Sequence, residues 1–168
     1  MKKVLFILGE LIEEDIDWLV EIGDRQLIPP AMVLIQEGRC VETLYILLEG
    51  ELSVLAQSLG GREIARLNRG EIVGEMSFVD SRPPSATVRA AQASQVFAIP
   101  QAQLAAKLDR DVGFASRFYR ALAMFLSNRL RSTVGQLGDR KETTLDLNDS
   151  SKLAQSRLES LLRRLQEK

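Results

Sequence analysis

The sequence predicts a mainly β domain with helices at both ends. Its central part, residues 25–100, alternates short apolar runs with turn-forming residues, which is typical of many short strands. Apolar residues recur at helical spacing before this region and again after it. With 168 residues, 45% of them hydrophobic, the chain can bury the core of one ordinary domain.

The first helix is expected between Leu11 and Ile22. Its apolar residues, which recur about every four positions, are Ile12, Ile16, Leu19, Val20 and Ile22. The positions between them hold the acidic residues Glu13, Glu14, Asp15 and Asp17. This pattern predicts an amphipathic helix, and Gly23 stands where its end is expected. The Pro29-Pro30 pair that follows favours an extended path.

The expected strands are the apolar runs MVLI, TLYILL, LSVL, EIARL and VFAI. They are separated by a proline cluster and by the turn-forming segments EGR, LEGE, LGGR and NRGE. Gly60-Gly61 is the strongest hairpin signal, because glycine accepts the positive φ angles of tight turns.

Helical spacing returns after Pro100, in a short segment at residues 104–108 and a long one at residues 112–137. The long segment carries a broad apolar stripe formed by Phe114, Phe118, Leu122, Phe125, Leu126, Leu130, Val134 and Leu137. Because this stripe is wider than one face of a β domain needs, we expect a homodimer through residues 112–137.

Residues 139–151 are mostly polar, which is typical of a linker. We therefore divide the chain into residues 1–138, one domain with its C-terminal helix, and residues 139–168, a linker with an amphipathic helix. The apolar face of that last helix is formed by Leu153, Leu158, Leu161, Leu162 and Leu165. Its basic residues, expected in solvent, are Arg157, Arg163, Arg164 and Lys168. We expect residues 153–165 to bind a protein partner.

Charge and length exclude several classes of protein. A net charge of −1 leaves no general basic field for DNA phosphates or an anionic membrane. The residues beyond Gly138 supply one convincing helix, not a helix-turn-helix, so we expect no DNA binding. No apolar run approaches the roughly 20 residues that cross a bilayer. Because Glu10 and later acidic residues interrupt the opening apolar run, we expect no secretory signal and a cytoplasmic protein.

The chain contains no histidine, which removes the commonest general base and the commonest metal ligand. Its single cysteine, Cys40, forms neither an intramolecular disulfide nor a four-thiolate cluster. The sequence shows no spacing typical of a nucleophile–base pair or a metal cluster. We therefore expect a protein that is not an enzyme, with no catalytic residue, no metal site and no cofactor.

Two segments carry a family resemblance: IQEGRCVETLYILLEGELSVL at residues 35–55 and GEIVGEMSFVDSRPPSATVRA at residues 70–90. Together they resemble the cyclic nucleotide-binding domain family, which includes the sensory domains of catabolite activator proteins and the regulatory subunits of the cAMP-dependent kinase. The resemblance covers about residues 5–138. It implies a jelly-roll-like β-roll (a double-stranded β-helix) with an N-terminal helix and C-terminal helices. Gly38 and Gly50 match the glycines that flank the family's strand pair.

The family's phosphate-binding cassette begins with a Gly-Glu pair and a short helix, which Gly74 and Glu75 match. The resemblance implies that Glu75 accepts a hydrogen bond from the ribose hydroxyl. It also implies that the backbone N–H groups of Met76 and Ser77 face the phosphate of cAMP or cGMP. The small residues and the strand that follow in the family are matched by Ser85, Ala86, Thr87 and Val88.

This alignment places Pro84 where the family has its phosphate-binding arginine. Proline offers neither a charge nor a backbone N–H, so one charge-assisted contact is missing. Arg82 is a better candidate than Arg89 to replace this arginine, although an exposed loop charge is the favoured interpretation of Arg82. Arg89 is more simply explained as a solvated strand residue.

The other candidate ligand contacts also have a purely structural alternative. The Glu75 carboxylate can cap local N–H groups without any ligand. Ser85 and Thr87 can satisfy nearby backbone groups instead of a phosphate or purine. Two functions follow: a regulatory domain that senses cAMP or a related anionic effector and relays it through the C-terminal helices, or a degenerate, ligand-free interaction module.

Overall fold

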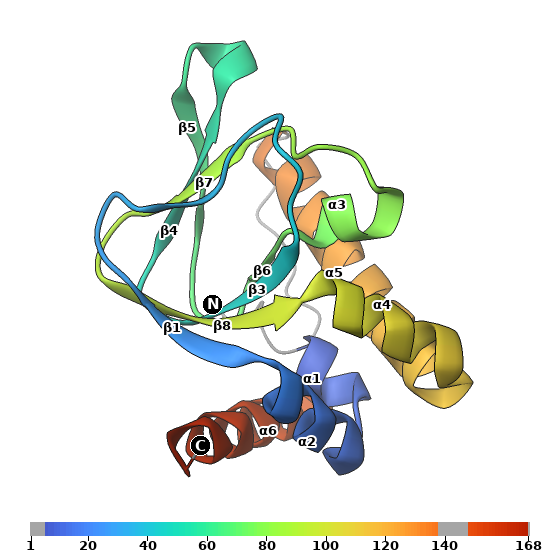
Figure 1. The fold of residues 1–168 in the computed structure, drawn as a ribbon. Helices are drawn as coiled ribbons and strands as arrows, with labels where there is room; N and C mark the ends of the chain where they lie inside the picture. Colours follow the sequence, from blue (N-terminus) through green and yellow to red (C-terminus); the bar gives the residue numbers. More distant parts are fainter. Residues whose placement is uncertain (1–5, 138–147, 168) are drawn as a thin grey trace. The chain divides into compact units, whose positions relative to one another are not determined.

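A computed structural model describes residues 6–137 and 148–167 of the chain (Figure 1). The chain forms two compact units, one made of residues 19–106 and the other of residues 1–18 together with 107–168. This grouping places the long C-terminal helix beside the N-terminal helices. The division at residue 138 remains a prediction about which part of the chain folds by itself.

The unit of residues 19–106 is a β-roll of two four-stranded antiparallel sheets, which confirms the predicted fold class (Figure 1). The first sheet has the order β1 (Asp24–Ile28), β8 (Ser94–Pro100), β3 (Thr43–Glu49) and β6 (Ile72–Val73). The second has the order β2 (Val33–Ile35), β7 (Thr87–Ala90), β4 (Leu52–Ala56) and β5 (Arg62–Leu67). Apolar residues of both sheets form the core cluster Ile28, Ile35, Leu47, Leu52, Leu67, Val73, Val88, Ala90 and Val96.

The predicted apolar runs coincide with β2, β3, β4, β5 and β8. The hairpin expected at Gly60-Gly61 is confirmed, with φ angles of 72° and 73°, and a short 3₁₀ helix, η1 (Gln57–Leu59), precedes it. Strand β1 had no signal in the sequence, because Ile28 is its one buried residue and the other four are exposed.

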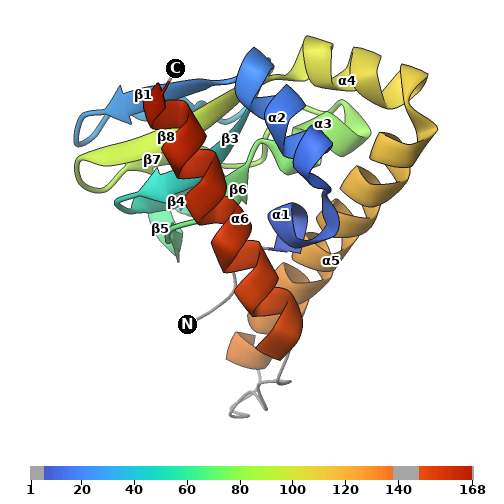
Figure 2. The same cartoon turned by 90° about the horizontal axis from the view of Figure 1, so that it is seen from below.

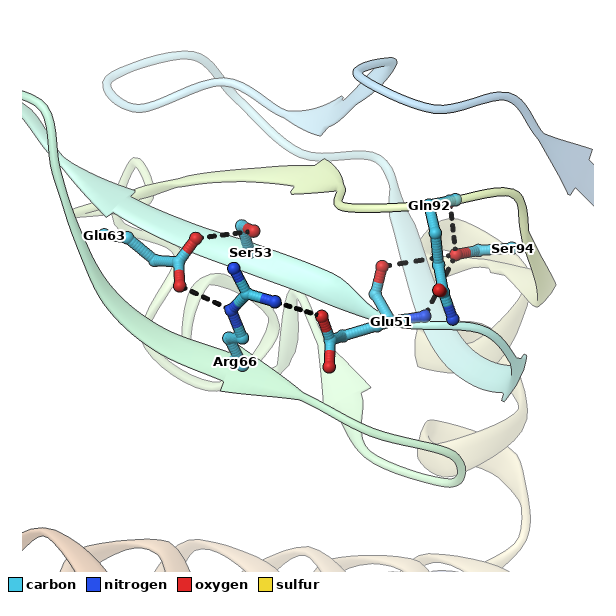
Figure 3. A network of polar contacts seen from close by, with 6 residues as sticks. All are labelled: Glu51, Ser53, Glu63, Arg66, Gln92 and Ser94. Atoms are coloured by element: carbon cyan, nitrogen blue, oxygen red, sulfur yellow. Dashed lines mark hydrogen bonds and ion pairs between the residues drawn. The ribbon is translucent and has the colours of Figure 1, made fainter.

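The chain crosses between the two sheets after β3, where Gly50 lies against Ser94. Gly50 has a φ of +94°, and a Cβ there would lie 2.3 Å from Ser94 Oγ. Ser94 Oγ accepts a hydrogen bond from the Glu51 N–H at 3.2 Å and donates to the Gln92 carbonyl at 2.9 Å (Figure 3). Only glycine fits so close to Ser94, which explains why a glycine, Gly50, stands between β3 and β4.

A polar network continues from this crossing onto the outer face of β4 and β5 (Figure 3). Arg66 donates from Nε to Glu63 and from Nη1 to Glu51, and Glu63 accepts from the buried Ser53 hydroxyl at 2.9 Å. Hydrogen bonds from Arg66 and then Ser53 lower the pKa of Glu63. The network satisfies a buried hydroxyl on a strand that otherwise packs apolar side chains.

The second unit contains α1 (Phe6–Glu10), α5 (Val112–Leu137) and α6 (Asn148–Glu167). It also contains α2 (Glu13–Ile22) as far as Trp18. Helix α4 (Gln101–Arg110) leads from β8 to α5. Helix α2 begins at Glu13. The Asp15 carboxylate accepts a hydrogen bond from the N–H of Ile12, the residue before this helix, at 3.0 Å. In a capping box, the side chain three residues into the helix bonds to the N–H of the residue that caps it. This contact explains why α2 starts as a new helix after α1.

The structure shows that the aromatic part of the α5 stripe is covered within the chain itself and is therefore not available to a partner. Phe114, Phe118 and Phe125 are at most 4% exposed within the chain itself. Phe114 packs edge-on against Trp18, with ring centroids 5.4 Å apart. The exposed apolar residues of α5 include Leu130 and Val134, at 65% and 59%. The homodimer remains a prediction, and it now rests on these two residues.

The structure corrects our expectation for α6. This helix packs along α1 (Figure 2), and its Leu158, Leu161 and Leu165 are buried. Arg157 and Arg164, expected in solvent, are 15% and 27% exposed and contact the N-terminal helices. The periodicity identified the apolar face correctly but could not show that the chain itself covers it.

Candidate functional site

The candidate site begins at the turn between β6 and helix α3 (Glu75–Asp80). Gly74 caps this helix with a φ of +90°, and a Cβ on it would lie 2.9 Å from the Thr43 carbonyl oxygen. An L-residue would be strained there and would also press on the backbone of β3. The sequence therefore needs glycine at this position for the turn, whether or not a ligand binds.

Glu75, the first residue of α3, is only 3% exposed. A buried carboxylate in the first turn is favoured by the positive end of the helix dipole. Met76 is 56% exposed and Ser77 is half-buried. The first intrahelical hydrogen bond runs from the Phe78 N–H to the Gly74 carbonyl at 3.1 Å, so the N–H groups of Met76 and Ser77 precede the helical ladder.

Helix α3 ends at Asp80, and the capping residue Ser81 has a φ of 57° and donates its N–H to the Ser77 carbonyl at 2.9 Å. Arg82 follows, with a side chain that is 83% exposed and an Nε 3.9 Å from Asp80 Oδ2. Its backbone N–H donates to Asp80 Oδ1 at 3.0 Å. A surface ion pair of this length holds the arginine weakly, so the guanidinium can leave Asp80 at little cost.

Two hydrogen bonds tie the segment after Arg82 to the loop between β2 and β3. Gly38 donates its N–H to the Pro84 carbonyl at 2.9 Å. Glu37 donates its N–H to Thr87 Oγ1 at 3.1 Å. Glu37 in turn accepts the Gln57 N–H on its carboxylate at 2.8 Å. We call Glu37 and Gly38, which these contacts hold against the cassette, the strap. No pattern in the sequence had pointed to Glu37.

The small residues of the cassette lie at the start of β7. Ser85 is exposed, Ala86 is half-buried, and the Thr87 hydroxyl serves as the acceptor described above. The backbone contact that we considered for Thr87 is therefore present, and a ligand contact there remains a prediction. Arg89 is exposed on the face of β7 opposite the buried Val88 and Ala90, as expected for a solvated strand charge.

Ile35 joins the two halves of the cassette. It is in register with Val88 of β7, and its Cδ1 lies 3.6 Å from the position that a Cβ on Gly74 would take. The glycine turn before α3 and the strand after Pro84 thus meet at one buried side chain. A sequence profile described as "Cyclic nucleotide-binding domain" matches residues 25–111, which contain this whole arrangement.

The chain belongs to the cyclic nucleotide-binding domain family. This family consists of regulatory domains related to the cyclic AMP receptor proteins. Membership confirms the resemblance derived from residues 35–55 and 70–90 and explains why a turn glycine, Gly74, and a short helix lie between β6 and β7.

Among curated proteins, this chain is 29% identical to the "Cyclic AMP receptor protein" of Thermus thermophilus over 123 residues. That match covers 72% of this chain and 55% of the relative. This chain is also 32% identical over 84 residues to the "cAMP-activated global transcriptional regulator CRP" of Salmonella typhimurium. That second match covers 48% of this chain and 40% of the relative. The chain thus spans about half the length, or less, of these relatives.

Solved structures show the same fold. A cyclic nucleotide-binding domain from Methylobacillus flagellatus superimposes with a TM-score of 0.73 at 22% identity, covering 85% of both chains. The catabolite activator protein of Thermus thermophilus superimposes with a TM-score of 0.65 at 22% identity, covering 96% of this chain and 87% of that one.

Two further observations concern the described residues alone. Within residues 6–137 and 148–167, no helix is both long and apolar enough to span a membrane. The same part of the chain holds no group of three or more cysteine or acidic side chains arranged to bind a metal ion.

Proposed function

We propose that this domain senses cAMP or a related small anionic effector, such as cGMP, in its cassette and relays binding through its C-terminal helices. The observation that carries the proposal is the start of α3. There a glycine in a left-handed conformation is followed by a buried Glu75, the pair that matches the Gly-Glu pair of the family's cassette. This arrangement presents a carboxylate and helix-start amides from one rigid turn.

Each retained residue has a role in this proposal. Glu75 accepts a hydrogen bond from the ribose hydroxyl, and the N–H groups of Met76 and Ser77 donate to the cyclic phosphate. Ser85, Ala86 and Thr87 line the phosphate from the start of β7, where small side chains let the ligand approach the backbone. We infer no enzymatic role for any of them, and we infer a cytoplasmic protein that does not bind DNA.

The missing arginine sets the expected affinity. Pro84 supplies no cation, and its carbonyl already accepts the Gly38 N–H. Arg82 is near enough in sequence to substitute but has an acidic neighbour, Asp80, at 3.9 Å. Because a hydrogen bond to a charged group contributes ~1.5 to 3 kcal/mol, affinity should be roughly ten- to a hundredfold below that of relatives with the arginine.

A ligand-free interaction module is the second candidate, and one observation favours it. The backbone N–H groups of the strap, Glu37 and Gly38, donate to the Thr87 hydroxyl and to the Pro84 carbonyl within the chain. A cassette held in this way does not need a ligand to order it. In that case α5 provides the assembly surface, as a homodimer through residues 112–137 in which Leu130 and Val134 meet their counterparts.

Thermal melts with cAMP, cGMP and cyclic dinucleotides distinguish the two functions. A ligand present at about 100 times its dissociation constant stabilises the domain by about 2.7 kcal/mol. We expect cAMP or cGMP at millimolar concentration to raise the melting temperature, and 5′-AMP to serve as the matched non-cyclic control. The absence of any shift with every nucleotide, for a chain that melts cooperatively, would favour the interaction module.

A further inference from the structure

Helix α6 covers the N-terminal helices through a small apolar strip. It packs along α1, and its buried residues Leu158, Leu161 and Leu165 follow one another at helical spacing (Figure 2). Leu8 of α1 and the nearby Leu11 are also buried. Burial of three leucines is a modest apolar contact for a helix of 20 residues.

Arg157 of α6 caps the C-terminal end of α1. Its Nη1 donates to the Leu8 carbonyl at 2.9 Å and to the Gly9 carbonyl at 2.7 Å. The last carbonyls of a helix lack intrahelical donors and carry the negative end of its dipole, so a guanidinium is well placed there. A helix of five residues such as α1 is unstable by itself. Its stability therefore depends on its packing against other helices, and both α5 and α6 contact it.

Arg164 holds α6 to an acidic edge of α2. Its Nη2 donates to Glu13 Oε2 at 2.8 Å, and its Nη1 donates to Asp17 Oδ1. Glu13 also lies 4.0 Å from Arg157 Nε. Glu13 and Asp17 are four residues apart on one helix, so they form a continuous acidic strip facing two arginines separated by two helical turns.

The balance of these contacts points to weak docking. Glu13 and Asp17 have side chains that are 55% and 63% exposed, so their ion pairs are screened by salt. Arg157 Nε is buried and has no hydrogen-bond acceptor among the described residues. Burying a donor without an acceptor costs free energy, and this cost weakens the docking of α6. Helix α6 is thus specific in its contacts but poorly anchored.

We propose that α6 is a releasable latch. Within its own chain, α6 occupies a surface of α1 and α2 that binds an amphipathic helix. The helix that fits this surface has leucines on one face and two arginines seven residues apart. Release of α6 opens this surface to a partner helix of the same chemistry. The proposal does not depend on whether the cassette binds a nucleotide.

The test uses the full chain and a fluorescent peptide of residues 148–167 as the incoming helix. In the variant Arg157→Glu/Arg164→Glu the chain's own α6 is repelled by Glu13 and Asp17 while the surface stays intact. We expect this variant to bind the peptide at least roughly tenfold more tightly than wild type at low ionic strength. Binding should weaken in ~0.5 M salt. Arg163→Glu changes an exposed arginine of the same helix and should behave like wild type.

Adding Glu13→Lys and Asp17→Lys to the double variant should abolish peptide binding, because the acidic strip is then lost. Equal affinity of the peptide for wild type and the double variant would overturn the latch, as would no binding by a double variant that melts cooperatively. Hydrogen exchange of the wild-type chain gives an independent answer if the variant fails to fold. We expect the α6 amides to exchange at least roughly tenfold faster than those of β3. Exchange of both at the same rate would show that α6 opens only with global unfolding.

Discussion

Arg117 of α5 donates from Nε and Nη2 to the two carboxylate oxygens of Asp15 in α2, at 2.6 and 2.8 Å. The Asp15 side chain is 5% exposed and that of Arg117 is 30% exposed. The hydrogen bond that Arg117 donates to the Asp15 carboxylate is the main reason that the pKa of Arg117 is raised. A two-pronged contact of this kind fixes the angle at which the guanidinium meets the helix.

Replacing Asp15 should therefore destabilise the helical unit. Asp15→Asn keeps an acceptor for the Ile12 N–H but leaves Arg117 without its counter-charge, at a cost of about 3 kcal/mol, the lower end of the range for broken buried pairs. Urea denaturation measures this change. Glu14→Gln, an exposed neighbour on the same helix, is the control and should stay within about 0.5 kcal/mol of wild type. Equal losses in both variants would contradict the role given to the pair.

Gly74→Ala should disturb the cassette turn more than a comparable glycine elsewhere. Both the φ of +90° and the carbonyl oxygen of Thr43 at 2.9 Å oppose a Cβ. Gly60 has a similar φ of +72° with nothing within 4 Å, so Gly60→Ala measures conformational strain alone. We expect Gly60→Ala to cost about 1 kcal/mol and Gly74→Ala about 2 to 3 kcal/mol by denaturant unfolding. A Gly74→Ala loss no larger than that of Gly60→Ala would refute the steric part.

Pro84→Arg should strengthen cAMP binding roughly ten- to a hundredfold, because it restores one permanent cation at the anion site. Proline substitutions that suit the backbone contribute only about 0.4 to 1 kcal/mol, less than a charge-assisted contact. Isothermal titration at fixed low salt measures both proteins. Arg82→Ala is the control: tight wild-type binding that disappears in Arg82→Ala would show that Arg82 already substitutes.

The N-terminus of α5 should give the stability a defined acid dependence. The pKa of Asp111 is lowered first by the Phe114 N–H, which donates to it at 2.9 Å, and then by Lys107. A carboxylate with a lowered folded-state pKa stabilises the fold above its usual value of 3.8, and this contribution is lost as the pH falls through the folded-state value.

Asp111→Asn preserves the cap but removes the titration. The difference in unfolding free energy between wild type and this variant should therefore be largest near neutral pH and shrink below about pH 4. Urea melts over this pH range provide the measurement. A difference that stays constant down to about pH 2.5 would exclude the assigned role of Asp111.

Dimerisation through α5 should depend on its exposed C-terminal half. Leu130→Asp and Val134→Asp place charges on residues that are 65% and 59% exposed, so they should dissociate a dimer without unfolding the monomer. Light scattering at tens of micromolar decides the mass. Val112→Asp, at an 80% exposed position of the same helix, is the control. A monomeric wild type would contradict the dimer.

The sequence by itself determined the local features of the domain. Apolar alternation located β3, β4, β5 and β8, and the pattern of residues 70–90 located the cassette and its missing arginine. Gly74 and Gly60 were identifiable because only glycine readily adopts their backbone angles, a property of the single residue. Such signals survive in a sequence because they depend on near neighbours along the chain.

The tertiary structure alone decided which surfaces meet. Periodicity identified the leucine face of α6 and the phenylalanines of α5, but both faces proved to be covered within the chain. The hydrogen bond between Glu37 and Thr87 joins residues 50 apart, and the one between Arg157 and Leu8 joins residues 149 apart. No local signal in the sequence pointed to either pairing. An amphipathic pattern records that a face is removed from water, and the hydrophobic effect is non-directional. The identity of the covering element is therefore settled only when the whole chain packs.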